Sequence, residues 1–241
     1  MRLEDFSNNF DTLLNSYAVA AGFGSTDNPS SIELDEYEKS QFLTKAQEEV
    51  VLSLYNGKNP YRESFEQTEE LRRYLAPLVK EAELSPIATS NGMPLGVDSK
   101  SKFFTLPEDL WFITYESVKL DDAKCDEMSN QDVYPVRQDE YHKIKKNPFR
   151  GANDRRALRL DLSEGNIEIV SKHNVTKYYL RYLRKVKPIL LISLADGMTL
   201  EGYDTPQECE LHESLHQRIL ELAVTMALQS QGYSRNNNNR E

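Results

Sequence analysis

The stretch DEYEKSQFLTKAQEEVVLSLYNG, residues 35–57, contains a start signal, an apolar stripe and a stop signal for a single α-helix. Asp35 can cap the first turn, and Glu38 stands where a reciprocal capping box requires it. Gly57 can end the helix, because glycine adopts the left-handed conformation that often follows a last turn. The apolar stripe must pack against another element, and its expected core residues are Phe42, Ala46, Val50 and Leu54.

Three further segments show helical periodicity. Residues 3–21 form an amphipathic pattern, and residues 66–76 form a shorter one that stops at Pro77. Residues 207–231 predict a closing helix, whose expected core residues are Leu211, Leu215, Ile219 and Leu222. We expect the helices from the two ends of the chain to pack together as one helical bundle.

The segment between these helices has the composition of β-strands. Its β-branched and aromatic runs are separated by Gly, Pro, Asn and Asp. Residues 157–172 predict a hairpin that turns at Glu164-Gly165-Asn166. Residues 176–193 predict one long strand with a break or an edge at Pro188.

Strands that are grouped between helices indicate the α+β class rather than alternating βαβ units. The predicted architecture is a helical bundle of the N-terminal and C-terminal helices with an inserted antiparallel β domain, either a sandwich or barrel-like. The expected divisions are N-terminal bundle helices over 1–80, a β domain over 81–205 with a short helix near 138–146, a closing helix over 206–231 and a disordered tail over 232–241.

Charge is distributed unevenly along the chain. The formal net charge is −10, but residues 137–187 hold 14 Lys/Arg against 6 Asp/Glu, so this region carries +8 and the remainder carries −18. An acidic body with one basic region suggests an electrostatically oriented contact, while the alternative is a solvated surface of mixed charge. The expected inter-protein contact residues are Lys143, Lys145, Lys146, Arg150, Arg155 and Arg156.

Several classes of protein are disfavoured by what the sequence lacks. It has no run of about 18 apolar residues, so we expect no membrane-spanning helix. Its first residues lack the apolar segment of a signal peptide. Cys125 and Cys209 are expected to be reduced thiols. No glycine-rich phosphate loop or nucleophile elbow occurs, so we predict no catalytic residue and no cofactor.

One motif with chemical meaning does occur. His212-Glu213-Ser214-Leu215-His216 matches H-E-x-x-H, in which two histidines at i and i+4 of a helix bind zinc and the glutamate acts as a base. A catalytic zinc also needs a third protein ligand, and Ile219 and Leu222 stand where one metalloprotease form has Gly and His. We therefore interpret both histidines as boundary residues of a structural helix and predict no metal, with a zinc metallohydrolase as an alternative.

Six segments in a specific order resemble one protein family. They are FSNNFDTLLNS (6–16), LDEYEKSQFLTKAQEEVVLSLYNG (34–57), LPEDLWFITYESV (106–118), YPVRQDEYHKIKKNPFRG (134–151), YYLRYLRKVKPILLISL (178–194) and ECELHESLHQRILELAV (208–224). Within the second, Leu43-Thr44-Lys45-Ala46-Gln47-Glu48-Glu49-Val50 is similar to the helix that opens the bundle of head–tail connector proteins of tailed phages. Nearly the whole chain resembles a structural protein of crAss-like Bacteroides phages.

This resemblance implies a function without catalysis. Such proteins form a homo-oligomeric ring, commonly twelve-fold, that docks beneath the portal protein, contacts further ring or tail proteins and lets DNA pass without sequence-specific binding. It implies a location at the head–tail junction of the virion, after synthesis in the host bacterial cytoplasm, and no membrane partner. A second alternative is a nucleic-acid-binding module that uses the basic 137–187 region, against which the net charge of −10 argues.

Overall fold

The computed structural model describes residues 1–20, 33–58, 67–87, 96–121, 130–195 and 197–230. The chain divides into two compact units. The helical unit comprises residues 1–78 together with 186–241, and the β unit comprises residues 79–185. Helices and strands are thus grouped, which confirms the α+β class.

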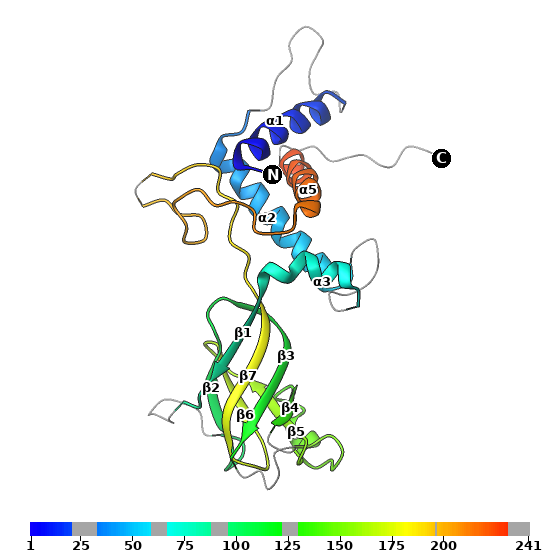
Figure 1. The fold of residues 1–241 in the computed structure, drawn as a ribbon, viewed down its shortest axis with the longest axis vertical. Coiled ribbons are helices and arrows are strands. Elements are labelled where there is room, and N and C mark those ends of the chain that lie inside the picture. The colour runs from blue at the N-terminus through cyan, green and yellow to red at the C-terminus, as the bar shows by residue number, and fades with distance from the viewer. Residues whose placement is uncertain (21–32, 59–66, 88–95, 122–129, 196, 231–241) are drawn as a thin grey trace, which may run out of the picture. The chain divides into compact units, whose positions relative to one another are not determined.

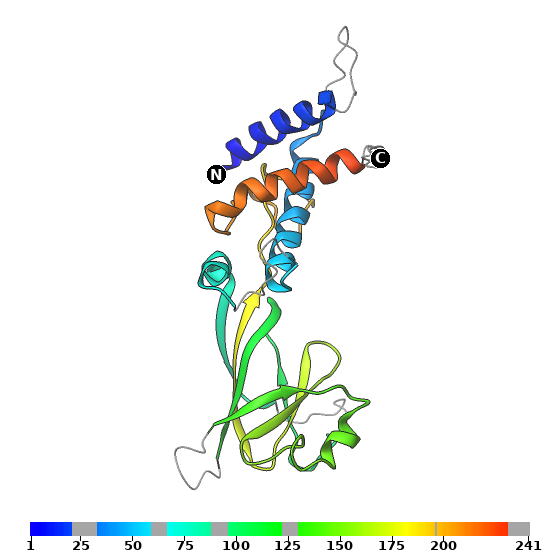
Figure 2. The same ribbon diagram turned by 90° about the vertical axis from the view of Figure 1, so that its right-hand side faces the viewer.

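The helical unit contains α1 (Leu3–Ala20), α2 (Glu36–Tyr55), α3 (Glu69–Leu75) and α5 (His216–Ser230). Short 3-10 turns follow α3 at Ala76–Leu78 and precede α5 at Glu213–Leu215. Helix α5 packs against both α1 and α2 (Figure 1; Figure 2). The first and last helices of the chain therefore share one core, as the periodicity predicts.

The ends of α2 match their sequence signals. Asp35 accepts a hydrogen bond from the backbone N–H of Glu38, whose own side chain accepts from the N–H of Asp35, so the predicted capping box forms. The helix ends before Gly57, which has a φ of +70°. That angle is in the left-handed region, where glycine bears no steric penalty, so the residue can end the helix.

Burial in α2 and in the segment that includes α5 differs partly from the predicted apolar stripes. Ala46, Val50 and Leu54 of α2 are buried, whereas Phe42 is half-buried because the buried face is centred on Leu43. Of the predicted core residues near α5, Leu211, Leu215 and Ile219 are buried, whereas Leu222 is only half-buried. The expected closing helix also begins later, since regular α5 starts at His216 rather than near residue 207.

A polar stripe on α2 explains part of this shift. Ser40, Thr44 and Gln47 are all buried, and they hydrogen-bond the backbone of residues 187–191. Ser40 Oγ accepts from the N–H of Leu191 at 3.0 Å, and Gln47 Nε2 donates to the carbonyl of Lys187 at 2.7 Å. These side chains satisfy backbone groups that would otherwise be buried without partners.

Residues 186–205 consequently belong to the helical unit, although the sequence predicts them as part of the β domain. The expected long strand over 176–193 ends at Arg184, and the chain then runs along α2. The first two residues of the apolar segment 189–192, Ile189 and Leu190, are fully buried against helix α2. Apolar runs of this length do not distinguish strands from other buried segments.

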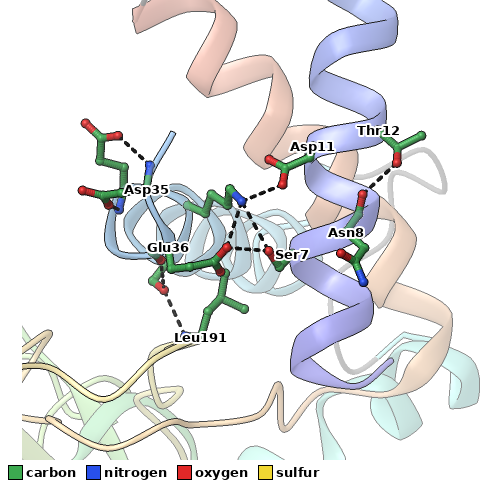
Figure 3. Close-up of polar contacts among 10 residues, drawn as sticks. Ser7, Asn8, Asp11, Thr12, Asp35, Glu36 and Leu191 are labelled. Atoms are coloured by element: carbon green, nitrogen blue, oxygen red, sulfur yellow. Dashed lines mark hydrogen bonds and ion pairs between the residues drawn. The ribbon is translucent and has the colours of Figure 1, made fainter. Parts of the chain in front are cut away.

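Helices α1 and α2 are also joined by a buried ammonium. The side chain of Lys39 is only 5% exposed, and its Nζ lies 2.7 Å from Asp11 Oδ2 and 2.9 Å from Glu36 Oε1. Figure 3 shows Ser7 and Asp11 of α1 facing Glu36 of α2, where Ser7 Oγ donates to Glu36 at 2.7 Å. Burial by itself would lower the pKa of Lys39, but the hydrogen bonds that its ammonium donates to both carboxylates raise that pKa overall.

The β unit is a single seven-stranded sheet that curls on itself as a half-barrel (Figure 1; Figure 2). Its strand order is β1-β7-β3-β4-β5-β6-β2. The strands are β1 (Val79–Leu84), β2 (Lys102–Thr105), β3 (Leu110–Leu120), β4 (Asn130–Pro135), β5 (Arg156–Asp161), β6 (Asn166–Val170) and β7 (Val175–Arg184). Just beyond β1, Ile87 forms a bridge to Phe103 of β2, so the two edges of the sheet approach each other there.

The hairpin of β5 and β6 has the predicted turn. Glu164 and Gly165 both have positive φ, at 58° and 70°, and the N–H of Asn166 donates to the carbonyl of Ser163. Two consecutive positive φ angles characterise the type I′ turn, whose twist fits that of paired strands. Ile167 and Ile169 of this hairpin pack with Phe104 and Tyr178 in the main core of the β unit.

One pairing differs from the predicted antiparallel domain: β4 and β5 are parallel. Parallel neighbours need a crossover connection, and residues 136–155 supply one that contains the short helix α4 (Tyr141–Lys145). The predicted helix near 138–146 is therefore part of this crossover. Since five of the six strand pairings are antiparallel, the sheet remains mostly antiparallel.

Candidate protein–protein contact site

The predicted contact residues lie in one short segment, made of the crossover that contains α4 and the first residue of β5. Asn147 organises the loop, because its Oδ1 accepts from the N–H groups of Phe149 and Arg150 at 2.9 and 3.2 Å. The N–H of Gly151 donates to the carbonyl of Asn147 at 2.8 Å. A Cβ at position 151 would lie 2.9 Å from that same carbonyl oxygen, so only glycine fits without a local shift.

All six predicted basic residues lie on this crossover or at the start of β5, and all are exposed except Arg156, which is half-buried. Lys145 Nζ forms an ion pair with Asp98 at 2.9 Å. Arg156 lies 4.2 Å from the centre of the Tyr134 ring, and its Nη1 donates to the carbonyl of Phe149 at 3.1 Å. Within the described ranges, four of the six side chains have neither an ion pair nor a hydrogen bond, namely Lys143, Lys146, Arg150 and Arg155.

An exposed aromatic side chain stands among these cations. Phe149 is 85% exposed, the largest exposure recorded for a large hydrophobic residue in the described part of the chain. Its backbone is fixed on both sides by Asn147 and Arg156. An exposed aromatic ring in a segment rich in arginine has the composition of an interface anchor, and the prior ordering of its loop lowers the entropic cost of binding.

A cavity of about 430 Å³ adjoins the same crossover. Its three lysines come from different parts of the β unit: Lys100 precedes β2, Lys145 ends α4 and Lys172 follows β6. Its apolar wall comes from a small hydrophobic cluster that includes Leu158 and Val170. The lining residues are Asp98, Lys100, Tyr141, Lys145, Ala152, Leu158, Val170, Ser171 and Lys172. Since three of them are Lys and one is Asp, the lining carries a positive formal charge.

Three groups that line this cavity have shifted pKa values: those of Asp98, Tyr141 and Lys145, of which the last is raised by the hydrogen bond to Asp98. The hydrogen bond from Lys145 lowers the pKa of the Asp98 carboxyl. Burial raises the pKa of the Tyr141 hydroxyl, and the Lys145 ammonium, 5.8 Å from the ring centre, only partly offsets this. Tyr141 is 2% exposed, and its hydroxyl has no hydrogen-bond partner among the described residues.

The H-E-x-x-H segment does not have the geometry of a zinc site. His212 precedes the helix with a ψ of 141°, and His216 is the first residue of α5, so the two do not share one face of a helix. His212 Nδ1 accepts from the N–H of Ser214 and so caps the short turn before α5. The described residues contain no group of three or more His, Cys, Asp or Glu side chains that could hold a metal ion.

His216 has a structural environment. Its ring is 6% exposed, packs 5.4 Å from that of Phe6 and has Nε2 3.0 Å from the carbonyl oxygen of Leu211. Burial lowers its pKa, which favours the neutral imidazole. Neither histidine has the expected boundary position on the helix, because His212 is exposed and precedes α5, whereas His216 is buried.

Neither Phe149 nor the cavity was predicted from the sequence. A signal for Phe149 was present, since Asn147-Pro148-Phe149-Arg150-Gly151 places one aromatic residue among turn formers inside a basic segment. The cavity could not be found in this way, because its lining comes from segments between residues 98 and 172 that only the curled sheet brings together.

None of the helices that the structure describes is long and apolar enough to cross a membrane.

Comparisons with known proteins agree with the resemblance seen in the sequence. The family described as phage tail ring protein 3/4 matches residues 1–239. Ring protein 3 of Bacteroides phage crAss001 is 46% identical over 231 residues, which cover 95% of both chains. Ring protein 4/5 of the same phage is 28% identical over 236 residues, covering 94% of this chain and 92% of the relative. The chain therefore belongs to the phage tail ring protein 3/4 family and is a structural ring protein of the crAss-like phage virion.

Proposed function

We propose that the chain closes a homo-oligomeric ring at the head–tail junction, docks beneath the portal protein and continues the channel through which DNA passes. The observation that carries this proposal is the match of nearly the whole chain to a family of ring proteins. Twelve-fold symmetry, which the resemblance to connector proteins implies, is part of the proposal. Such a ring closes because the same rotation relates each copy to the next around one axis.

The surface chemistry supports a contact between proteins. A ring requires heterologous interfaces, in which two different surfaces of each copy meet. The basic crossover with Phe149 supplies one surface that is exposed, charged and held in a defined conformation. Within the proposal, the six basic residues contact a neighbouring protein of the assembly.

The overall charge supports passage of DNA in preference to binding of DNA. Outside residues 137–187 the chain carries −18. A channel wall built from such a surface repels duplex phosphates, so DNA slides past without being retained. This is the opposite of what a sequence-specific nucleic-acid-binding module requires, and that alternative lacks a supporting observation.

The proposed docking can be tested with purified portal protein. We expect the chain and the portal to co-sediment as one complex in a density gradient, and negative-stain images to show an added annulus on the portal. A matched variant with Phe149→Ala, Arg150→Glu and Arg155→Glu tests whether the crossover takes part. A chain that assembles into no ring, either alone or with the portal, would overturn the proposed function.

A further inference from the structure

A second exposed surface, in the helical unit, has the opposite charge to the basic crossover. Between Lys187 and Arg218 the sequence contains six Asp/Glu and no Lys or Arg. Glu201, Asp204 and Glu208 of this segment are exposed. Two large apolar side chains are exposed beside them, Ile192 at 39% and Met198 at 46%. The segment is thus both acidic and apolar, as a partner of a basic aromatic surface should be.

Glu201 is presented at the tip of a small hairpin. Leu200 and Tyr203 bridge each other, with hydrogen bonds of 2.8 and 3.0 Å between their backbone groups. The two residues between them, Glu201 and Gly202, have φ angles of 51° and 88°, as in a type I′ turn. A two-residue turn of this type leaves the tip side chain in solvent and gives it a defined direction.

The β unit contains a site whose chemistry suits such a tip. The 430 Å³ cavity beside the crossover combines an apolar wall with Lys100, Lys145 and Lys172. Lys145 is paired with Asp98, and Lys100 donates to the carbonyl of Lys172 at 2.6 Å. The side-chain ammonium of Lys172 is exposed and has no partner within the described ranges. The buried hydroxyl of Tyr141, which also lines the cavity, lacks one as well.

We propose that the Glu201–Gly202 hairpin of one chain docks at the lysine-rimmed cavity of the next chain in the ring, with the Glu201 carboxylate paired to Lys172. The apolar side chain of Met198 lies against the apolar wall, and the neighbouring carboxylates Asp204 and Glu208 face the crossover. The contact joins two different surfaces of identical chains. That is the heterologous arrangement from which cyclic rings are built.

A second copy of this chain is the occupant that the charges favour. The chain carries both members of the pair: an exposed acidic hairpin with the exposed side chain of Met198 beside it, and a basic cavity whose wall contains the apolar residues Ala152, Leu158 and Val170. Complementary charge directs such partners toward one register and disfavours like-charged alternatives. The inference rests on the proposed ring function and adds to it the surfaces that meet between neighbouring copies.

The decisive experiment is a charge-reversal series read by mass photometry at one fixed protein concentration. Glu201→Lys and Lys172→Glu should each lower the oligomeric fraction by about ten-fold, since like charges then meet at the contact. The double variant with both changes should recover most of the wild-type fraction. Glu221→Lys, a reversal on the exposed face of α5, is the matched control and should leave assembly unchanged.

Glu201→Asn separates the charge from the shape of the turn. Asn-Gly is a preferred pair for a type I′ turn, so the hairpin keeps its conformation while the carboxylate is lost. We expect this variant to retain wild-type thermal stability and to assemble more weakly. Unchanged assembly in Glu201→Asn and in both single reversals would overturn the contact and leave the ring proposal standing. A wild-type chain that stays monomeric both alone and with the portal would instead overturn both proposals.

Cross-linking gives a direct positional test. In a background without Cys125 and Cys209, the pair Glu201→Cys and Lys172→Cys should yield disulfide-linked ladders on non-reducing gels after mild oxidation. The control pair Lys172→Cys and Glu221→Cys should give only monomers. Equal ladders from both pairs, or none from the first pair in assembled protein, would contradict the proposed register.

Discussion

Lys39 Nζ lies 2.7 Å from Asp11 Oδ2, and this ion pair joins the middle of α1 to the first turn of α2. The Lys39 side chain is 5% exposed, whereas Asp11 and Glu36 are 44% and 35% exposed. The two signs of charge are therefore desolvated to different degrees. The cost of removing one member should depend strongly on which member is removed.

We predict that Lys39→Met lowers the free energy of unfolding by less than about 1 kcal/mol, because the two carboxylates can be rehydrated. The double variant Asp11→Asn and Glu36→Gln should cost about 3 kcal/mol, because it leaves a buried ammonium without a counter-charge. Urea denaturation of both variants, with the triple variant as control, measures the asymmetry. Equal losses in the two variants would contradict this explanation.

A second buried ion pair lies within the β unit and should affect the pH dependence of stability. Arg159 Nη1 lies 2.8 Å from Glu116 Oε1, and Tyr178 donates to the other oxygen of Glu116 at 2.7 Å. Burial raises the pKa of the Glu116 carboxyl, and Arg159 opposes this shift. Removal of Arg159 should therefore raise the pKa of Glu116 further.

We predict that Arg159→Met destabilises the chain by about 3–5 kcal/mol near neutral pH. A carboxyl whose folded pKa exceeds its unfolded value contributes most stability below the unfolded pKa and loses it as pH rises through the folded pKa. The deficit of Arg159→Met should thus be smaller near pH 4.5 than at pH 7.5, and Glu116→Gln in the same background should remove the difference. A deficit that does not vary with pH would exclude Glu116 as its source.

His216 should make stability depend on pH in the opposite direction. Burial lowers the pKa of its imidazole below the usual value of 6.5, so the unfolded chain binds a proton more readily than the folded chain. Stability should therefore fall as pH decreases from about 6.5 toward the folded pKa. Thermal denaturation of the wild type against His216→Gln measures this contribution, and His212→Ala serves as the exposed control.

The same histidines allow a direct test of the zinc alternative. Since His212 precedes α5, we expect metal analysis of the purified chain to find no stoichiometric zinc. His216→Ala should lower the free energy of unfolding by about 1–3 kcal/mol, because it leaves a cavity against Phe6 and a carbonyl without its donor. Stoichiometric zinc that is lost in His216→Ala would revive the alternative.

The crossover loop allows assembly to be separated from stability. Phe149 is 85% exposed, so Phe149→Ala should change the free energy of unfolding by less than about 0.5 kcal/mol. It should nevertheless weaken assembly, because an exposed aromatic anchor is lost. Gly151→Ala should instead destabilise the loop, since its Cβ would lie 2.9 Å from a backbone carbonyl oxygen. Denaturation and mass photometry on the same samples distinguish the two effects.

Local signals in the sequence predicted local structure well. The capping box of Asp35 and Glu38 and the turn at Glu164-Gly165 depend on residues three or fewer positions apart, and both form. The grouping of helices and strands was also sufficient to predict the α+β class. These features require no knowledge of distant partners.

Features that depend on distant partners were not predictable in this way. Ser40, Thr44 and Gln47 are polar and buried because the segment 187–191 runs beside α2, and no local pattern indicates this. The parallel pairing of β4 with β5 depends on the path of the crossover. The basic residues were identified from charge alone, but the cavity beside them exists only in the folded sheet.

An end-on view of the assembled protein by electron cryomicroscopy, in the presence of the portal, would show directly whether the chain closes a ring. We predict closed annuli of identical subunits, about twelve in number, with a central opening that admits duplex DNA. The density should place the Glu201 hairpin of each subunit against Lys172 of its neighbour. Particles that remain single chains, or open filaments without closure, would contradict the account.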